Sequence, residues 1–124
     1  MPRVFLADSL PVEQSALRLI LTDLKMKVVG EASDWAGILA KAPASLLNIL
    51  LVSWELLPTE SPALALANLR VVYPDLFIIV LTSPLDTRQQ TALVSGADAF
   101  ISRADTPDRV ILQLQMAATR IHPL

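Results

Sequence analysis

Short apolar runs alternate with segments of helical periodicity along the whole chain. The runs are short enough and apolar enough to be buried strands, and they cover residues 4–7, 28–32, 48–52, 76–81 and 99–101. After each run, apolar residues recur every three or four positions. This spacing predicts helices over residues 12–24, 35–41, 61–72, 87–95 and 108–119. Ser9, Asp34 and Ser61 are expected N-caps, Pro43 is expected to stop the second helix, and Gly96 is expected to cap the fourth.

Strands that are apolar throughout, rather than alternating, predict a parallel sheet with helices on both faces. Right-handed crossovers then favour an open, doubly wound α/β sheet. The periodicity does not distinguish a flavodoxin-like from a Rossmann-like strand order. No linker, repeat or low-complexity segment divides the chain, so residues 1–124 are expected to form one domain.

Composition narrows the class of protein. Of the 124 residues, 53% are hydrophobic and the mean hydropathy is +0.52, which predicts a large core. No apolar run reaches the ~20 residues that span a bilayer, the start of the chain has no signal-peptide pattern, and there is no cysteine. The net charge is −2, without the basic excess of a nucleic-acid footprint. We therefore expect a cytoplasmic protein that contacts neither membrane nor nucleic acid directly.

Polar residues stand where three of the predicted strands end. Asp8 and Ser9 follow the first strand, Ser53 follows the third, and Thr82 follows the fourth. In open parallel sheets the functional site lies at this carboxyl edge. The sequence predicts a single carboxylate there, Asp8, because Glu55 is expected to point away from the pocket. A lone carboxylate is a poor site for a divalent cation.

Several motifs, in order and at matching spacing, resemble the receiver domain of bacterial two-component response regulators. They cover nearly the whole chain: Arg3-Val4-Phe5-Leu6-Ala7-Asp8-Ser9, Val28-Val29-Gly30-Glu31-Ala32, Tyr73-Pro74-Asp75, Ile78-Ile79-Val80-Leu81-Thr82 and Gly96-Ala97-Asp98-Ala99-Phe100-Ile101. The second of these is similar to regulators with a LuxR-type output domain. The resemblance implies a flavodoxin-like (CheY-like) five-stranded sheet in the order 2-1-3-4-5, acting in signal transduction or a phosphorelay.

The resemblance also assigns site positions. In that family an aspartate on the third strand accepts a phosphoryl group, helped by magnesium, an acid pair, a hydroxyl and a lysine. By position, Asp8 keeps one acid and Ser9 replaces the other, Ser53 takes the acceptor place, Thr82 keeps the hydroxyl, and Arg103 takes the place of the lysine. Phe100 stands at the position of the aromatic switch residue of that family.

These departures indicate a degenerate pseudo-receiver. Ser53 offers no carboxylate for an acyl phosphate, and the magnesium ligands fall to Asp8, so we expect no cofactor and weak or absent magnesium binding. Arg103 carries a fixed charge that could pair with Asp8 and occupy the space of the metal. Asp8 itself could be a remnant of the site, a cap for the following turn, or both. Phe100 is expected to be at least partly core, and Trp54 a loop anchor or an exposed contact.

We therefore expect a non-enzymatic interaction module that associates through its last helices. Leu112 and Met116 stand four residues apart, on the side of the last helix opposite its predicted core face, and are candidate interface residues. The alternatives are a small flavodoxin-like enzyme or a nucleotide-binding module. An enzyme would be favoured by a second aspartate at position 10 or by a Gly-x-Ser-x-Gly elbow, and the sequence has neither. A nucleotide-binding module would be favoured by a glycine-rich first turn, which is also absent.

Overall fold

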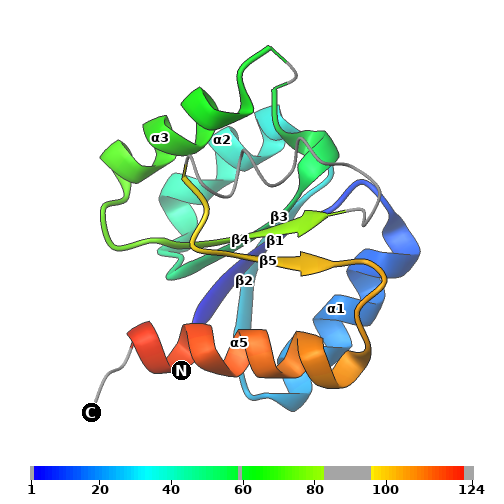
Figure 1. Ribbon diagram of the computed structural model, residues 1–124. Helices are drawn as coiled ribbons and strands as arrows, with labels where there is room; N and C mark the ends of the chain where they lie inside the picture. Colours follow the sequence, from blue (N-terminus) through cyan, green and yellow to red (C-terminus); the bar gives the residue numbers. More distant parts are fainter. Residues whose placement is uncertain (1, 59, 83–95, 122–124) are drawn as a thin grey trace.

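A computed structural model describes residues 2–58, 60–82 and 96–121 of the chain. Five strands form one parallel sheet in the order β2-β1-β3-β4-β5, which confirms the predicted fold class (Figure 1). They are β1 (Arg3–Ala7), β2 (Lys27–Ala32), β3 (Ile49–Ser53), β4 (Phe77–Thr82) and β5 (Ala99–Ser102). The helices are α1 (Pro11–Asp23), α2 (Trp35–Ser45), α3 (Pro62–Val72) and α5 (Pro107–Ile121), with a 3₁₀ turn, η1 (Trp54–Leu56).

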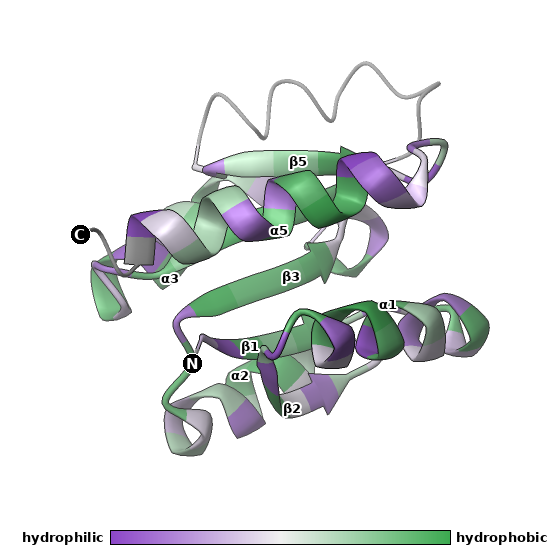
Figure 2. Ribbon diagram, turned by 90° about the horizontal axis from the view of Figure 1, so that it is seen from below, coloured by the Kyte–Doolittle hydropathy of each residue, from purple (hydrophilic) through white to green (hydrophobic). Residues whose placement is uncertain are grey.

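The helices form a layer on each side of the sheet. Helices α2 and α3 cover one face, and α1 and α5 cover the other (Figure 1). Strand β3 lies in the middle of the sheet and is hydrophobic along almost its whole length (Figure 2). All five of its residues are buried, because both faces of a central parallel strand pack against helices.

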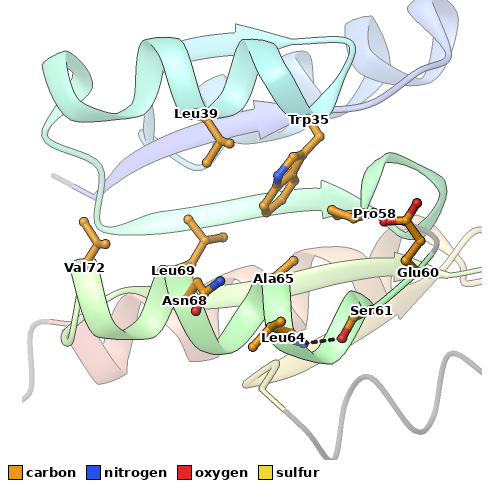
Figure 3. A pocket seen from close by; sticks show the side chains of 10 residues that line it. All are labelled: Trp35, Leu39, Pro58, Glu60, Ser61, Leu64, Ala65, Asn68, Leu69 and Val72. Carbon is orange, nitrogen blue, oxygen red and sulfur yellow. Dashed lines mark hydrogen bonds between the residues drawn. The ribbon is translucent and has the colours of Figure 1, made fainter.

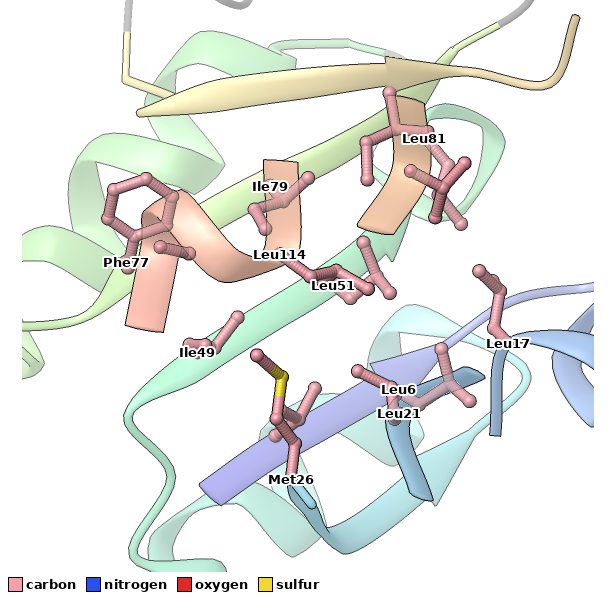
Figure 4. Close-up of a cluster of buried hydrophobic side chains, with 14 residues drawn as sticks. Leu6, Leu17, Leu21, Met26, Ile49, Leu51, Phe77, Ile79, Leu81 and Leu114 are labelled. Carbon is pink, nitrogen blue, oxygen red and sulfur yellow. The ribbon is translucent and has the colours of Figure 1, made fainter. Parts of the chain in front are cut away.

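Two hydrophobic clusters fill the spaces between the layers. Under α1 and α5, Leu21 and Leu114 pack on strand residues such as Leu51, and all three are fully buried (Figure 4). Under α2 and α3, Ile38 and Leu66 pack on the opposite face. Along β1, β3 and β4 the side chains alternate between the two clusters, which explains why these strands are apolar between their ends. The edge strand β2 carries Lys27 and Glu31.

Asp34 and Ser61 cap helices α2 and α3 as expected. The Asp34 carboxylate accepts the backbone N–H of Gly37 at 2.6 Å, and the Ser61 hydroxyl accepts that of Leu64 at 3.4 Å. Ser9 is not a cap. The helix α1 begins after Leu10, and no side chain caps it.

The second helix is longer than predicted. Pro43 does not stop α2, which continues to Ser45. A proline inside a helix removes one backbone hydrogen bond. Here Ala42 and Ser45 are buried on either side of Pro43, and the Ser45 hydroxyl donates to the Ala42 carbonyl at 2.8 Å. The packing of the last turn against the sheet offsets the lost bond.

The phase of α5 is as predicted. Val110, Leu114 and Ala117 are buried toward the sheet, whereas Leu112 and Met116 are 55% and 54% exposed. The spacing of Ala16, Leu17, Ile20 and Leu24 predicts one apolar stripe on α1, but Leu17 is buried whereas Ala16 is exposed, so Ala16 does not belong to it. The predicted helix over 87–95 lies outside the described residues. No described helix is long and apolar enough to cross a bilayer.

Candidate functional site

The strand register brings the predicted site residues to one edge of the sheet. Ala7 of β1 pairs with Val52 of β3. The next residue on each chain segment, Asp8 and Ser53, therefore lies at the same edge of the sheet. On the other side Ser53 is paired with Leu81 of β4, and Thr82 is paired with the last residue of β5. Asp8, Ser53 and Thr82 are 0%, 0% and 4% exposed. The carboxyl edge is therefore a buried polar row, not a solvent-filled pocket.

The hydroxyl groups of this row bond within the protein. Ser53 Oγ donates to the Ala7 carbonyl at 3.4 Å, and Thr82 Oγ1 donates to the Ile101 carbonyl at 3.5 Å. Both contacts are long, so they are weak hydrogen bonds that tie neighbouring strands together. Ser9 is outside this row and donates to a Glu55 oxygen at 3.0 Å.

Arg103 is the centre of the site. Its backbone N–H donates to the Thr82 carbonyl at 2.9 Å, which fixes the side chain over the strand ends. Its Nε lies 3.0 Å from both carboxylate oxygens of Glu13. Its Nη2 lies 2.6 Å from Glu55 Oε1 and 3.5 Å from Asp8 Oδ1, and Nη1 lies 3.2 Å from Glu55 Oε2. One guanidinium thus joins three carboxylates from three parts of the chain.

The prediction of a single carboxylate at this edge is wrong. Glu13 and Glu55 also reach the site, and Glu55 points toward it rather than away. Glu55 lies in η1, where the chain turns tightly after Ser53, so strand alternation no longer decides its direction. Glu13 lies in the first turn of α1, and that end of the helix stands over the same edge.

Asp8 has the capping role that the sequence proposed for it. Its Oδ1 accepts the backbone N–H of Leu10 at 3.1 Å, so it caps the turn before α1. The same oxygen contacts Arg103. Among the described residues its other oxygen, Oδ2, is a buried side-chain atom without an assigned hydrogen bond.

The carboxylates of Asp8 and Glu13 influence each other's protonation. Burial and the neighbouring Asp8 carboxylate raise the pKa of Glu13 from its ordinary 4.5 to about 7, although Arg103 opposes the shift. The pKa of Asp8 is below its usual value. Burial by itself would raise it, but hydrogen bonds from Glu13, Ser53 and the Leu10 backbone, together with the charge of Arg103, have the larger effect. A protonated Glu13 can therefore donate a hydrogen bond to an ionised Asp8.

A divalent cation does not fit beside this guanidinium. Magnesium needs several oxygen ligands in near-octahedral geometry. A carboxylate such as that of Asp8 attracts cations, but it is already paired with Arg103. The same guanidinium pairs with Glu13 and Glu55. Residues 2–58, 60–82 and 96–121 hold no group of three or more acidic or histidine side chains placed to hold a metal ion. A cation would have to displace Arg103 first.

The remaining predicted residues lie away from this cluster. Phe100, on the edge strand β5, is 42% exposed, so it is not a core residue. It borders a hollow between β5 and α5 with Arg109 and Gln113. Leu112 and Met116 are exposed on α5. Trp54 is half-buried and packs against the cluster under α2 and α3, so it anchors the loop after β3.

The motif around Asp98 has a structural explanation that the sequence did not give. Asp98 Oδ2 accepts the backbone N–H of Ile78 at 2.8 Å and pairs with Arg70 at 2.6 Å. Arg70 also donates to the carbonyls of Leu76 and Gly96. These contacts join α3, β4 and the start of β5.

Solved structures share this fold over nearly the whole chain. The isolated REC domain of RcsB from Salmonella enterica serovar Typhimurium, solved with the phosphomimetic BeF3−, is 19% identical with a TM-score of 0.78, and the match covers 97% of each chain. A CheY-like response regulator receiver domain protein from Methanospirillum hungatei JF-1 is 19% identical with a TM-score of 0.81, covering 97% of this chain and 96% of that one. The signal receiver domain of a modulated diguanylate cyclase from Desulfovibrio desulfuricans G20 is 22% identical, with a TM-score of 0.79 and 98% and 96% coverage.

These comparisons show that the chain has the CheY-like receiver fold. In a longer structure, the RcsB response regulator of Salmonella typhimurium, the match covers 99% of this chain but 64% of that one, at 22% identity and a TM-score of 0.81. No family model matches the sequence, and no curated protein matches it significantly.

Proposed function

We propose that this chain is a pseudo-receiver: a signal-transduction domain of the two-component type that accepts no phosphoryl group and acts through protein contacts. The observation that carries the proposal is the guanidinium of Arg103, held by Asp8, Glu13 and Glu55 at the carboxyl edge of the sheet. By its resemblance to response regulators, this edge is where metal and phosphoryl group would bind. In this chain the guanidinium of Arg103 takes that place.

The chemistry of Ser53 supports the same proposal. A serine at the acceptor position cannot form the acyl phosphate that an aspartate forms. As a nucleophile it would also have to reach a phosphoryl donor. Ser53 is fully buried, and its hydroxyl donates to the Ala7 carbonyl at 3.4 Å.

The proposal includes a bacterial, cytoplasmic protein of the LuxR-type output subfamily, with no enzymatic activity, no cofactor and no direct contact with nucleic acid. A flavodoxin-like enzyme or a nucleotide-binding module is the less favoured reading. The first turn, Asp8-Ser9-Leu10-Pro11, lacks the glycines that would let a phosphate approach the backbone.

Incubation with acetyl phosphate and magnesium tests the loss of phosphoryl transfer. Intact-mass analysis should show no added phosphoryl group on the parent chain. The matched control combines Ser9→Asp, Ser53→Asp and Arg103→Lys, which restores the charges that the related receivers use. A stoichiometric, acid-stable or labile phosphoryl adduct on the parent would refute the proposal whatever the control does.

Self-association through α5 is the contact that we propose first. Leu112 and Met116 leave an apolar ridge on the outer side of this helix, and Phe100 adds apolar surface on the neighbouring edge strand. Leu112→Glu with Met116→Glu should leave the circular dichroism unchanged and shift the protein to monomer in light scattering. Gln115→Glu with Thr119→Glu, both exposed on α5, is the charge-matched control. A parent chain that is monomeric at high concentration would exclude self-association and leave a different protein as the partner.

A further inference from the structure

A second apolar surface lies on the face of the molecule opposite α5. Between α2 and α3 the structure has a hollow of about 310 Å³ (Figure 3). Trp35 and Leu39 of α2 point into it from one side, and Leu69 and Val72 of α3 from the other, with β3 behind them. Most of the residues that line this groove are apolar, and the polar ones are Glu60, Ser61 and Asn68.

The side chains along the groove are apolar and yet open to solvent. Leu39, Leu64 and Val72 are 52%, 59% and 67% exposed. Single exposed apolar residues need no explanation, but three on adjoining helices around one hollow make a contiguous patch. Trp35 is half-buried at its floor, and aromatic side chains of this kind anchor many interfaces.

The shape of the hollow indicates what could occupy it. Helices α2 and α3 have 11 residues each, so the groove between them is roughly 16 Å long. A groove of this length matches about three turns of a single helix.

Charge indicates which helix would fit. Among the lining residues, all of which the structure describes, Glu60 is the only charged one. It lies at one end of the groove, just before Ser61 caps α3 (Figure 3). An occupant would therefore be apolar along the groove and basic at the end that faces Glu60.

We propose that the groove between α2 and α3 binds an amphipathic helix of a partner protein. The helix presents apolar residues at i, i+4 and i+7 to the groove and a lysine or arginine to Glu60. This site is independent of the α5 surface and of the fate of the phosphoryl site, because it shares no residue with either. A receiver-fold domain with two separate surfaces could bridge two proteins.

A displayed library of 16-residue helical peptides, randomised on one face, tests the proposal. Selection against the parent chain should enrich peptides with the apolar spacing and a basic residue near one end. Binding of a selected peptide should change Trp35 fluorescence in a Trp54→Phe background. Leu39→Glu with Val72→Glu should weaken that binding at least tenfold, as expected when apolar anchors are lost. Leu19→Glu, at a residue that is 68% exposed on α1, is the matched control and should leave binding unchanged.

The charge at Glu60 gives a separate test. Glu60→Lys should weaken binding of peptides with a basic end about threefold, the range of an exposed ion pair, and favour acidic ones. Three results would overturn the proposal: no enrichment over proline-containing control peptides, selected peptides that bind the Leu39→Glu/Val72→Glu variant equally well, or a parent dimer in light scattering that this variant dissociates. The last would make a second copy the occupant.

Discussion

Arg103 and Glu55 are 48 residues apart in the chain, yet Arg103 Nη2 lies 2.6 Å from Glu55 Oε1. The pair forms because β3 and β5 end at the same edge of the sheet, and the turn η1 folds back over that edge. Asp8 and Glu13 bind the same guanidinium from the first strand and the first helix. The carboxyl edge of the sheet is thus occupied by ion pairs between Arg103 and three acidic side chains of the same chain.

Removing the central cation should destabilise the protein. Arg103→Ala leaves Asp8 buried without its counter-charge, and Glu13 and Glu55 lose their ion pairs with the guanidinium. We expect a loss of about 1–3 kcal/mol in the free energy of unfolding, below the cost of a fully buried pair because Glu55 is 41% exposed. Urea denaturation measures it, with Arg109→Ala, a 69% exposed arginine, as the control. Equal stability of parent and Arg103→Ala would show that the contacts contribute nothing.

Stability should fall as the pH rises toward neutrality. The pKa of Glu13 is raised to about 7 in the folded chain, and its ordinary value is 4.5, so the folded state holds the proton more tightly. The resulting stabilisation is complete below about 4.5 and is lost as the pH rises through about 7. Thermal unfolding between pH 5 and 8 should show a decreasing Tm.

The matched variant for this prediction is Glu13→Gln, which cannot titrate. It should flatten the pH dependence, because it removes the group whose proton affinity differs between the folded and unfolded states. The Asp8 carboxyl, with its pKa below the usual value, loses its contribution only at acidic pH outside this window. A Tm profile that is the same for parent and variant would contradict the raised pKa of Glu13.

Magnesium should leave the site unchanged until Arg103 is removed. Trp54 follows Ser53 directly and reports on this edge when Trp35 is replaced by phenylalanine. Its emission should not respond to millimolar magnesium in the parent. In Arg103→Ala the positive charge that opposes a cation beside Asp8 is gone, so the response to magnesium should be larger than in the parent and reversed by a chelator. A response of the parent that Asp8→Asn abolishes would mean that a cation displaces the guanidinium.

Asp98 should stabilise the fold through its hydrogen bonds. Asp98→Ala removes the acceptor for the Ile78 N–H and the counter-charge of Arg70. We expect a loss of about 1–3 kcal/mol, since a backbone donor in a central strand is left unpaired. Asp98→Asn keeps an acceptor oxygen and should lose less. If the two variants were equally destabilised in urea, the charge rather than the hydrogen bond to Ile78 would carry the effect.

The sequence by itself determined the elements and the fold class of this protein. Apolar runs without alternation specify strands buried on both faces, and three- and four-residue spacing gives the phase of α5, with Leu114 inside and Leu112 outside. Caps such as Asp34 act on neighbours three residues away, so their signals are local and can be read directly. The strand order came from the resemblance of motifs, and the structure confirms it.

Only the tertiary structure decided what occupies the carboxyl edge. Glu13 and Arg103 are 90 residues apart, and no local pattern shows that they meet. The direction of Glu55 depends on a 3₁₀ turn that breaks the alternation of the strand before it. The helix through Pro43 was likewise decided by the burial of Ala42 and Ser45, because packing against the sheet can offset a poor local propensity. Charge pairs and helix ends of this kind depend on three-dimensional neighbours, which periodicity along the chain does not contain.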